Sequence, residues 1–168
     1  MNNLIIIFFA EYFWWIFTVA VIAGFLWAER RNIRLGIYYS AIALVSALVA
    51  RLVVKPILLT FISRPRPFMI SGNAPLIPED VAAACCNSFP SGHALFVFAL
   101  ATVVFLYNKR WGMVAYIGAL LVGIARVLAG VHWPTDILGG AVIGVVVAYL
   151  VWKLAEKLKF KFLNTWQK

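Results

Sequence analysis

Residues 4–28 read LIIIFFAEYFWWIFTVAVIAGFLWA, an apolar run with one charged residue, Glu11. A helix of about 20 apolar residues is long enough to cross the hydrocarbon core of a bilayer. The rest of the chain has the same character, because 64% of its 168 residues are hydrophobic and 12% are charged. An ordinary soluble domain has roughly 25% charged residues. The composition therefore indicates an integral membrane protein.

Four further apolar runs follow the first, and together they predict an all-α, polytopic transmembrane helix bundle of about five spans. The predicted spans are Leu4 to Ala28, Leu35 to Ile62, His93 to Tyr107, Met113 to Ala129, and Pro134 to Leu154. We expect a single membrane domain over residues 1–168. The first run lacks a basic flank and a small-residue cleavage site, so we expect it to be a retained helix and not a signal peptide.

The distribution of basic residues predicts the orientation. In the five-span arrangement, most lysine and arginine residues fall on one side: Arg30, Arg31, Arg34, Lys109, Arg110, Lys153, Lys157, Lys159, Lys161 and Lys168. The positive-inside rule assigns this side to the cytoplasm, which leaves the amino terminus outside the plasma membrane and the carboxyl terminus inside. We attribute the net charge of +9 to this bias and to anionic lipid head groups, and not to nucleic-acid binding.

The longest connection, residues 63–89, is expected outside the membrane. It is rich in proline and has little helical periodicity, and loops of this length are usually functional or disordered. A substrate-contacting loop and a passive linker both fit this pattern. Cys85 and Cys86 lie in the loop, and we assign them no role, because adjacent cysteines rarely pair and neither has metal-ligand spacing.

Two polar fragments near the predicted helix ends contain both histidines of the chain. One is Pro90-Ser91-Gly92-His93, and the other is Arg126 with His132 and Asp136 in the pattern R-x5-H-x3-D. A single histidine at a membrane-helix end is more often an interfacial residue than a catalyst. Here, however, His132 and Asp136 are spaced i to i+4, so on a helix the carboxylate can reach the imidazole and orient it as a nucleophile or base.

The remaining basic residues are expected on the same side of the membrane as the histidines: Arg51, Lys55, Arg64, Arg66 and Arg126. Charges inside a span are disfavoured unless an anion compensates them. Arg64 and Arg66 can instead extend to the interface. Arg51 lies too deep for that, at roughly 16 Å before the end of its predicted span.

These motifs resemble those of the type 2 phosphatidic acid phosphatases (PAP2), which read K-x6-R-P, P-S-G-H and S-R-x5-H-x3-D. The second motif is matched fully, and the third has Ala125 in place of the usual serine. The first retains Arg66-Pro67 but has Leu59 where the lysine belongs. Lys55, one helical turn deeper on the same face, or Arg64 are candidate substitutes. The run from Arg64 to Phe68, together with Glu11-Tyr12, looks like the branch that dephosphorylates undecaprenyl diphosphate.

The resemblance implies a catalytic mechanism. His132 attacks phosphorus and forms a phosphohistidine, His93 protonates the leaving oxygen and later activates water, and Asp136 orients His132. The implied phosphate-binding groups are Arg66, Arg126, Ser91, Gly92, and Lys55 or Arg64. No carboxylate cluster suited to Mg²⁺ is evident, so we expect catalysis without a metal or other cofactor.

Other functions remain open on the sequence alone. The lipid is not determined, because phosphatidylglycerol phosphate and phosphatidate present the same phosphate at the interface as undecaprenyl diphosphate does. A lipid phosphotransferase uses the same phosphohistidine, and a non-enzymatic membrane protein is a further alternative. The oligomeric state is also open.

Glu11 is an acid within the first span that no family motif explains. An unpaired charge at that depth is costly, so we expect Glu11 to face the bundle and pair with Lys55 or Arg51. A protonated Glu11, or one that extends outward to the interface, is an alternative.

Overall fold

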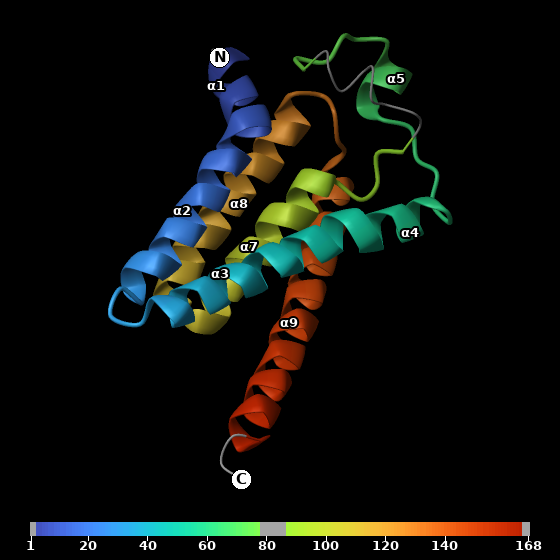
Figure 1. The fold of residues 1–168 in the computed structure, drawn as a ribbon. Coiled ribbons are helices and arrows are strands. Elements are labelled where there is room, and N and C mark those ends of the chain that lie inside the picture. Colours follow the sequence, from blue (N-terminus) through green and yellow to red (C-terminus); the bar gives the residue numbers. More distant parts are fainter. Residues whose placement is uncertain (1–2, 78–86, 166–168) are drawn as a thin grey trace.

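The computed structural model describes residues 3–77 and 87–165, and these form a bundle of helices (Figure 1). Within these ranges the only β-type pairing is an isolated bridge between Arg64 and Asn87. The all-α prediction is therefore confirmed for the part of the chain that is described. Cys85 and Cys86, to which we assigned no role, lie outside it.

Two of the helices contain a π-helical turn. The first helix comprises α1 (Asn3–Ile7), η1 (Phe8–Tyr12) and α2 (Phe13–Ala28), and the second comprises α3 (Ile33–Leu48), η2 (Val49–Val54) and α4 (Lys55–Leu59). After the short helix α5 (Pro67–Ser71) come α7 (Gly92–Tyr107), α8 (Lys109–Leu128) and α9 (Pro134–Thr165). The helix α9 continues past the predicted end at Leu154, because its Lys, Leu, Ala and Glu residues favour helix.

The lengths and apolar character of these helices confirm the transmembrane-bundle prediction. Asn3–Ala28, Ile33–Leu59, Lys109–Leu128 and Pro134–Lys159 are each long and apolar enough to cross a membrane, and Gly92–Tyr107 is a shorter apolar helix. The number of five spans and the orientation in the membrane remain predictions.

Helix α7 forms the centre of the bundle. It contacts α2, α3, α8 and α9, which surround it (Figure 1). Most of its side chains are buried, from Ala94 to Val103. A helix that is apolar on every face is stable only when other helices enclose it, which explains why this short helix is interior.

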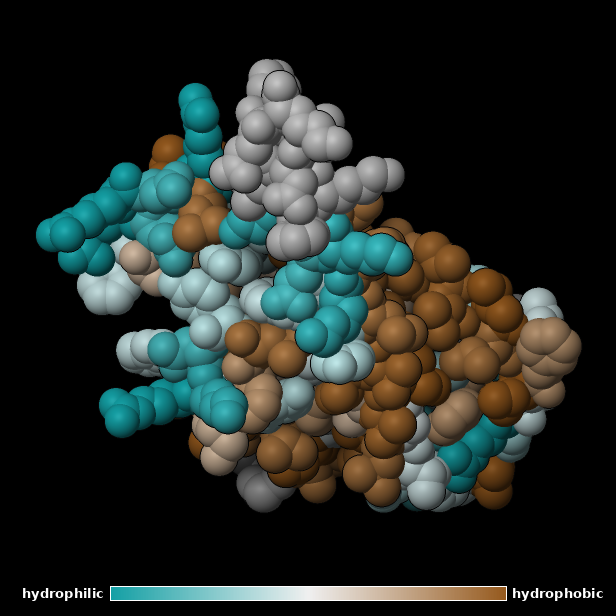
Figure 2. Space-filling view, turned by 90° about the horizontal axis from the view of Figure 1, so that it is seen from below, coloured by the Kyte–Doolittle hydropathy of each residue, from teal (hydrophilic) through white to brown (hydrophobic). Residues whose placement is uncertain are grey.

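The outer surface of the bundle is apolar as well. Trp15, Val19, Leu52 and Leu150 are each at least 60% exposed, and Figure 2 shows a broad area of hydrophobic side chains beside a more polar region. Monomeric soluble proteins rarely expose apolar patches of this extent. The surface is suited to contact with lipid tails.

The turns that connect the helices lie at two opposite ends of the bundle. The amino terminus, α4, α5 and the turn between α8 and α9 lie at one end, and the α2–α3 turn and the carboxyl terminus lie at the other (Figure 1). At this second end the Tyr107 hydroxyl donates to Glu29 Oε1 at 2.8 Å, and Asn108 caps α8 by accepting from the Arg110 and Trp111 N–H groups. The predicted site residues therefore lie near the helix termini at the first end of the bundle.

The close approach of α9 to α7 depends on glycine. A Cβ atom on Gly144 would lie 2.6 Å from the Leu95 carbonyl oxygen. On Gly140 it would lie 2.9 Å from the Ser91 carbonyl oxygen. Neither position accepts a side chain unless the two helices separate, and that would displace the start of α7 from the start of α9.

We expect Gly144→Ala to lower the free energy of unfolding by about 1–3 kcal/mol, because the added methyl group meets backbone that cannot rotate away. The measurement is thermal or denaturant unfolding in detergent. Gly24→Ala is the matched control, since a Cβ there has no atom within 4 Å and alanine favours a helix by about 1 kcal/mol. Equal stability of the two variants would contradict the packing described here.

Candidate active site

His132 lies in the turn between α8 and α9, and not on a helix as its i to i+4 spacing from Asp136 suggested. The helix α9 begins at Pro134, so Asp136 is in its first turn. From there the Asp136 carboxylate reaches back, with Oδ2 3.5 Å from His132 Nδ1 and 2.8 Å from the Trp133 N–H that donates to it. At this distance the two groups are in contact, and the geometry falls short of a hydrogen bond. The predicted contact between Asp136 and His132 therefore forms. It arises at the start of α9, where Asp136 reaches back to the preceding turn, and not along one face of a helix.

The Asp136 carboxylate is fully buried and collects donors from distant parts of the chain. The Ser88 hydroxyl donates to Oδ2 at 2.5 Å, and Arg64 Nη1 donates to Oδ1 at 2.8 Å. A buried carboxylate is costly unless such donors satisfy it. Sequence reasoning missed Ser88, whose only signal is its place two residues before Pro90.

Arg64, a candidate phosphate-binding residue, has its guanidinium at the start of α9. Besides Asp136, it donates to the Thr135 hydroxyl at 2.6 Å, and its guanidinium lies 5.6 Å from the Trp133 ring centroid. Its backbone carbonyl accepts from the Ser88 N–H at 2.8 Å. Arg64 therefore joins both ends of the long loop to the start of α9.

Helix α7 begins at the Pro-Ser-Gly-His motif. Ser91 is its N-cap, and the Ser91 N–H donates to the Asp136 carbonyl at 3.1 Å, which ties the starts of α7 and α9 together. A Cβ atom on Gly92 would lie 3.0 Å from Lys55 Nζ. The lysine that sequence reasoning offered as a substitute for Leu59 thus reaches the helix start that precedes His93.

Arg126, at the end of α8, is 1% exposed and acts electrostatically on both histidines. Its Nη1 lies 3.2 Å from Glu11 Oε2 and 3.4 Å from the Ala10 carbonyl oxygen. Glu11 therefore pairs with Arg126, and not with Arg51 or Lys55 as predicted. The π-turn η1 contains Glu11 and alters the face on which it emerges. Arg66 is also buried, and its charge acts on His132.

The surroundings of His132 keep its imidazole neutral. Burial lowers the pKa of His132 from its ordinary value to about 4; the Asp136 carboxylate opposes this shift, and the charges of Arg126 and Arg66 add to it. At neutral pH the ring therefore has a free lone pair, which is the form that acts as a nucleophile or base. The arrangement can bind an anion among basic groups and attack it with a nitrogen.

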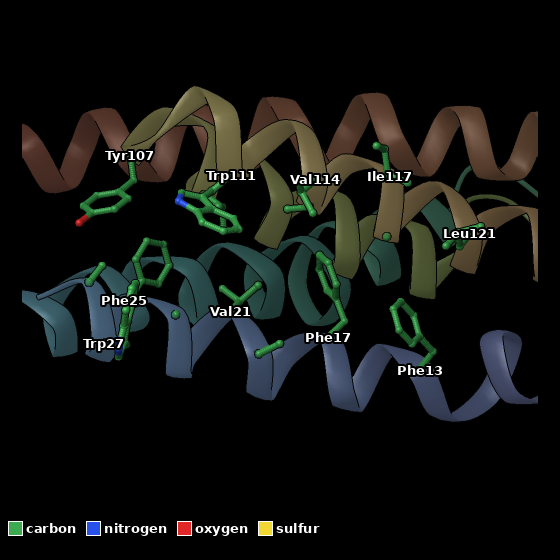
Figure 3. Close-up of a pocket in the computed structure, with 16 residues that line it drawn as sticks. Phe13, Phe17, Val21, Phe25, Trp27, Tyr107, Trp111, Val114, Ile117 and Leu121 are labelled. Atoms are coloured by element: carbon green, nitrogen blue, oxygen red, sulfur yellow. The ribbon is translucent and has the colours of Figure 1, made fainter. Parts of the chain in front are cut away.

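An apolar cavity of about 540 Å³ lies elsewhere in the bundle, between α2 and the α7–α8 pair (Figure 3). Phe13, Phe17, Phe25 and Trp111 are among its lining side chains, and none of the predicted site residues lines it. Without convergent polar groups, this cavity is unsuited to chemistry, and the candidate site is the polar cluster at the end of the bundle.

Comparison with known proteins finds a matching family. The sequence model of the PAP2 superfamily matches residues 35–160. The chain is 34% identical over 161 residues to the bacitracin transport permease protein BcrC of Bacillus licheniformis, which covers 95% of this chain and 75% of that protein. It is 28% identical over 155 residues to the undecaprenyl-diphosphatase BcrC of Bacillus subtilis (strain 168), which covers 92% and 76%.

A solved structure shares the fold. The crystal structure of Aquifex aeolicus LpxE superposes with a TM-score of 0.67 at 27% sequence identity, over 91% of this chain and 88% of that one. The arrangement of the helices is thus shared with a protein of known structure.

We expect Ser88→Ala to lower the free energy of unfolding by about 1–3 kcal/mol, because the buried Asp136 carboxylate loses a donor. Unfolding in detergent measures the effect. Ser71→Ala is the control: Ser71 is exposed, and its loss should change stability by no more than about 0.5 kcal/mol. If both variants were as stable as the wild type, Ser88 would not support the carboxylate.

Proposed function

The chain belongs to the PAP2 superfamily, and from this premise we propose that it is a lipid phosphatase that hydrolyses the terminal phosphate of undecaprenyl diphosphate at the outer leaflet. The observation that carries the proposal is the buried, neutral His132 backed by Asp136 and surrounded by basic side chains. A lipid with a phosphorylated head group fits both the apolar surface of the bundle and the basic site at its end. A soluble substrate would fit only the basic site.

The reaction has two steps. The free His132 nitrogen attacks the terminal phosphorus, the bond to the bridging oxygen breaks, and that oxygen receives the electron pair and a proton from His93. Water, deprotonated by His93, then attacks the phosphohistidine and releases inorganic phosphate. The Asp136 carboxylate stabilises the positive charge that His132 acquires in the first step.

Basic side chains hold the phosphoryl oxygens. Arg66 and Arg126 supply planar guanidinium groups suited to these oxygens, and both act electrostatically on His132. Lys55 is a better replacement than Arg64 for the missing motif lysine, because its Nζ lies beside Gly92 while Arg64 is bound to Asp136. The N–H groups at the start of α7 add further donors. This positive charge makes a metal ion unnecessary.

Undecaprenyl diphosphate is the substrate we favour, because a relative that shares most of its length with this chain is named an undecaprenyl-diphosphatase. Phosphatidylglycerol phosphate and phosphatidate are alternative substrates, and phosphoryl transfer to another lipid is an alternative reaction. Another relative is named a transport permease, which would predict movement of a substrate without release of phosphate.

We expect the purified protein in detergent to release phosphate from undecaprenyl diphosphate faster than from phosphatidylglycerol phosphate or phosphatidate. Release should continue in EDTA, because the arginines neutralise the substrate without a cation. The measurement is inorganic phosphate together with the lipid product. No phosphate release from any of these lipids would reject the proposal, and a loss in EDTA that Mg²⁺ restores would reject metal independence.

Two histidine variants test the nucleophile within the same assay. With substrate labelled by ³²P on the terminal phosphate, the wild type should acquire an acid-labile label, and His132→Ala should acquire none and release no phosphate. His93→Ala removes the other histidine and leaves the nucleophile, so it should still be labelled, but more slowly. Equal labelling of His132→Ala and the wild type would exclude His132.

The proposed outer-leaflet site predicts the topology. In a variant with Cys85 and Cys86 replaced by serine, a single cysteine at Asn73 should react in intact cells with a membrane-impermeant thiol reagent. A single cysteine at Asn108, at the opposite end of the bundle, should react only after the cells are lysed. The reverse pattern would place the site in the cytoplasm.

A further inference from the structure

Arg51 is a basic residue inside the second membrane helix, and the mechanism above does not use it. It lies in η2, more than two helical turns or roughly 12 Å before Leu59, where α4 ends. Its side chain is partly buried, and among the described residues no carboxylate lies within 4.0 Å of it, so Glu11 acts on it only from a longer distance. A charge at this depth is costly unless an anion compensates it.

The Trp14 ring contacts both Arg51 and His93. The Arg51 guanidinium carbon lies 5.0 Å from the centroid of the indole, and the His93 ring meets the same indole edge-on at 5.5 Å and 77°. Arg51 is also close enough to His93 to act on it electrostatically. Arg51 therefore points to the side of the site on which His93 lies, although its backbone belongs to another helix.

That side of the site is where the leaving group must be. In an in-line attack by His132, the bond that breaks points away from His132 and toward the proton donor His93. In a lipid diphosphate the leaving oxygen belongs to the inner phosphate, which carries the lipid chain and so lies nearer the bilayer centre than the terminal phosphate. Arg51 is one helical turn, roughly 6 Å, deeper than Lys55.

We propose that Arg51 forms a subsite for the inner phosphate of a lipid diphosphate, and so makes the enzyme selective for diphosphates over monophosphates. This inference rests on the proposed function. As the bridging bond breaks, the inner phosphate gains the electron pair, and the guanidinium stabilises that charge while His93 supplies the proton. A monophosphate has no phosphate at this position, so Arg51 does not stabilise the transition state of its cleavage.

The π-turns are consistent with a built subsite. Arg51 lies within η2, and Trp14 comes two residues after η1. Such turns are rare and occur often at functional sites, because the extra residue redirects the side chains that follow. Here the two turns lie on separate helices, and they contain or precede the cation and the indole that meet near His93.

The test compares farnesyl diphosphate with farnesyl monophosphate, which share a lipid chain and differ in the inner phosphate. Arg51→Met should lower kcat/KM for the diphosphate by about 10- to 100-fold, the effect of one charged hydrogen bond, and for the monophosphate by less than about threefold. Lys55→Met is the comparison: it acts on the terminal phosphate, so it should lower kcat/KM for both substrates by similar factors. Arg51→Lys keeps the charge and should lose less on the diphosphate than Arg51→Met.

Several results would overturn the inference. Equal losses on both substrates in Arg51→Met and Arg51→Lys would mean that Arg51 supports the site generally, and unchanged kinetics would mean that it binds nothing. If Arg51 instead held the phosphate of a bilayer phospholipid, Arg51→Met would abolish thermal stabilisation by added phosphatidylglycerol and would affect both substrates equally. A wild type that releases no phosphate from undecaprenyl diphosphate, phosphatidylglycerol phosphate or phosphatidate would reject the proposed function itself, whereas normal wild-type hydrolysis of farnesyl diphosphate with equal losses in the variants rejects only the subsite.

Discussion

The buried carboxylate of Asp136 is the constraint on which the site depends. Within an apolar bundle its charge must be satisfied, and its donors come from the turn before α9 and from both ends of the long loop. Those contacts fix Ser88 and Arg64, and the Asp136 backbone carbonyl holds the start of α7. The same carboxylate faces His132. One satisfied charge therefore organises the loop, two helix starts and the proposed nucleophile.

The basic side chains follow a second constraint, the cost of charge within a membrane. The charge of Arg126 is compensated partly by Glu11, which is 115 residues away in the sequence. In the proposed function Arg66 and Lys55 bind the terminal phosphate, and Arg51 extends the positive charge deeper into the bundle. A head group with two phosphates matches that distribution better than a head group with one, because the positive charge is spread along the membrane normal.

The helix packing makes these electrostatics possible. Helix α7 is enclosed by α2, α3, α8 and α9, and its side chains from Ala94 to Val103 are buried. Glycines on α9 allow backbone contact with it, and this brings His93 and Asp136 to the same end of the bundle.

Sequence alone determined the membrane-embedded helical bundle and its family, because apolar run length and motif spacing are local properties of the chain. It also identified the two histidines, Asp136 and the basic residues of the candidate site. Only the tertiary structure determined their partners: Ser88 and Arg64 on Asp136, Glu11 on Arg126, and Trp14 between Arg51 and His93. Loop residues reach their partners through contacts distant in sequence, which no periodicity encodes. Glu11 and Arg51 lie within the π-turns η1 and η2, so the periodicity of a regular α-helix does not predict the faces on which they emerge.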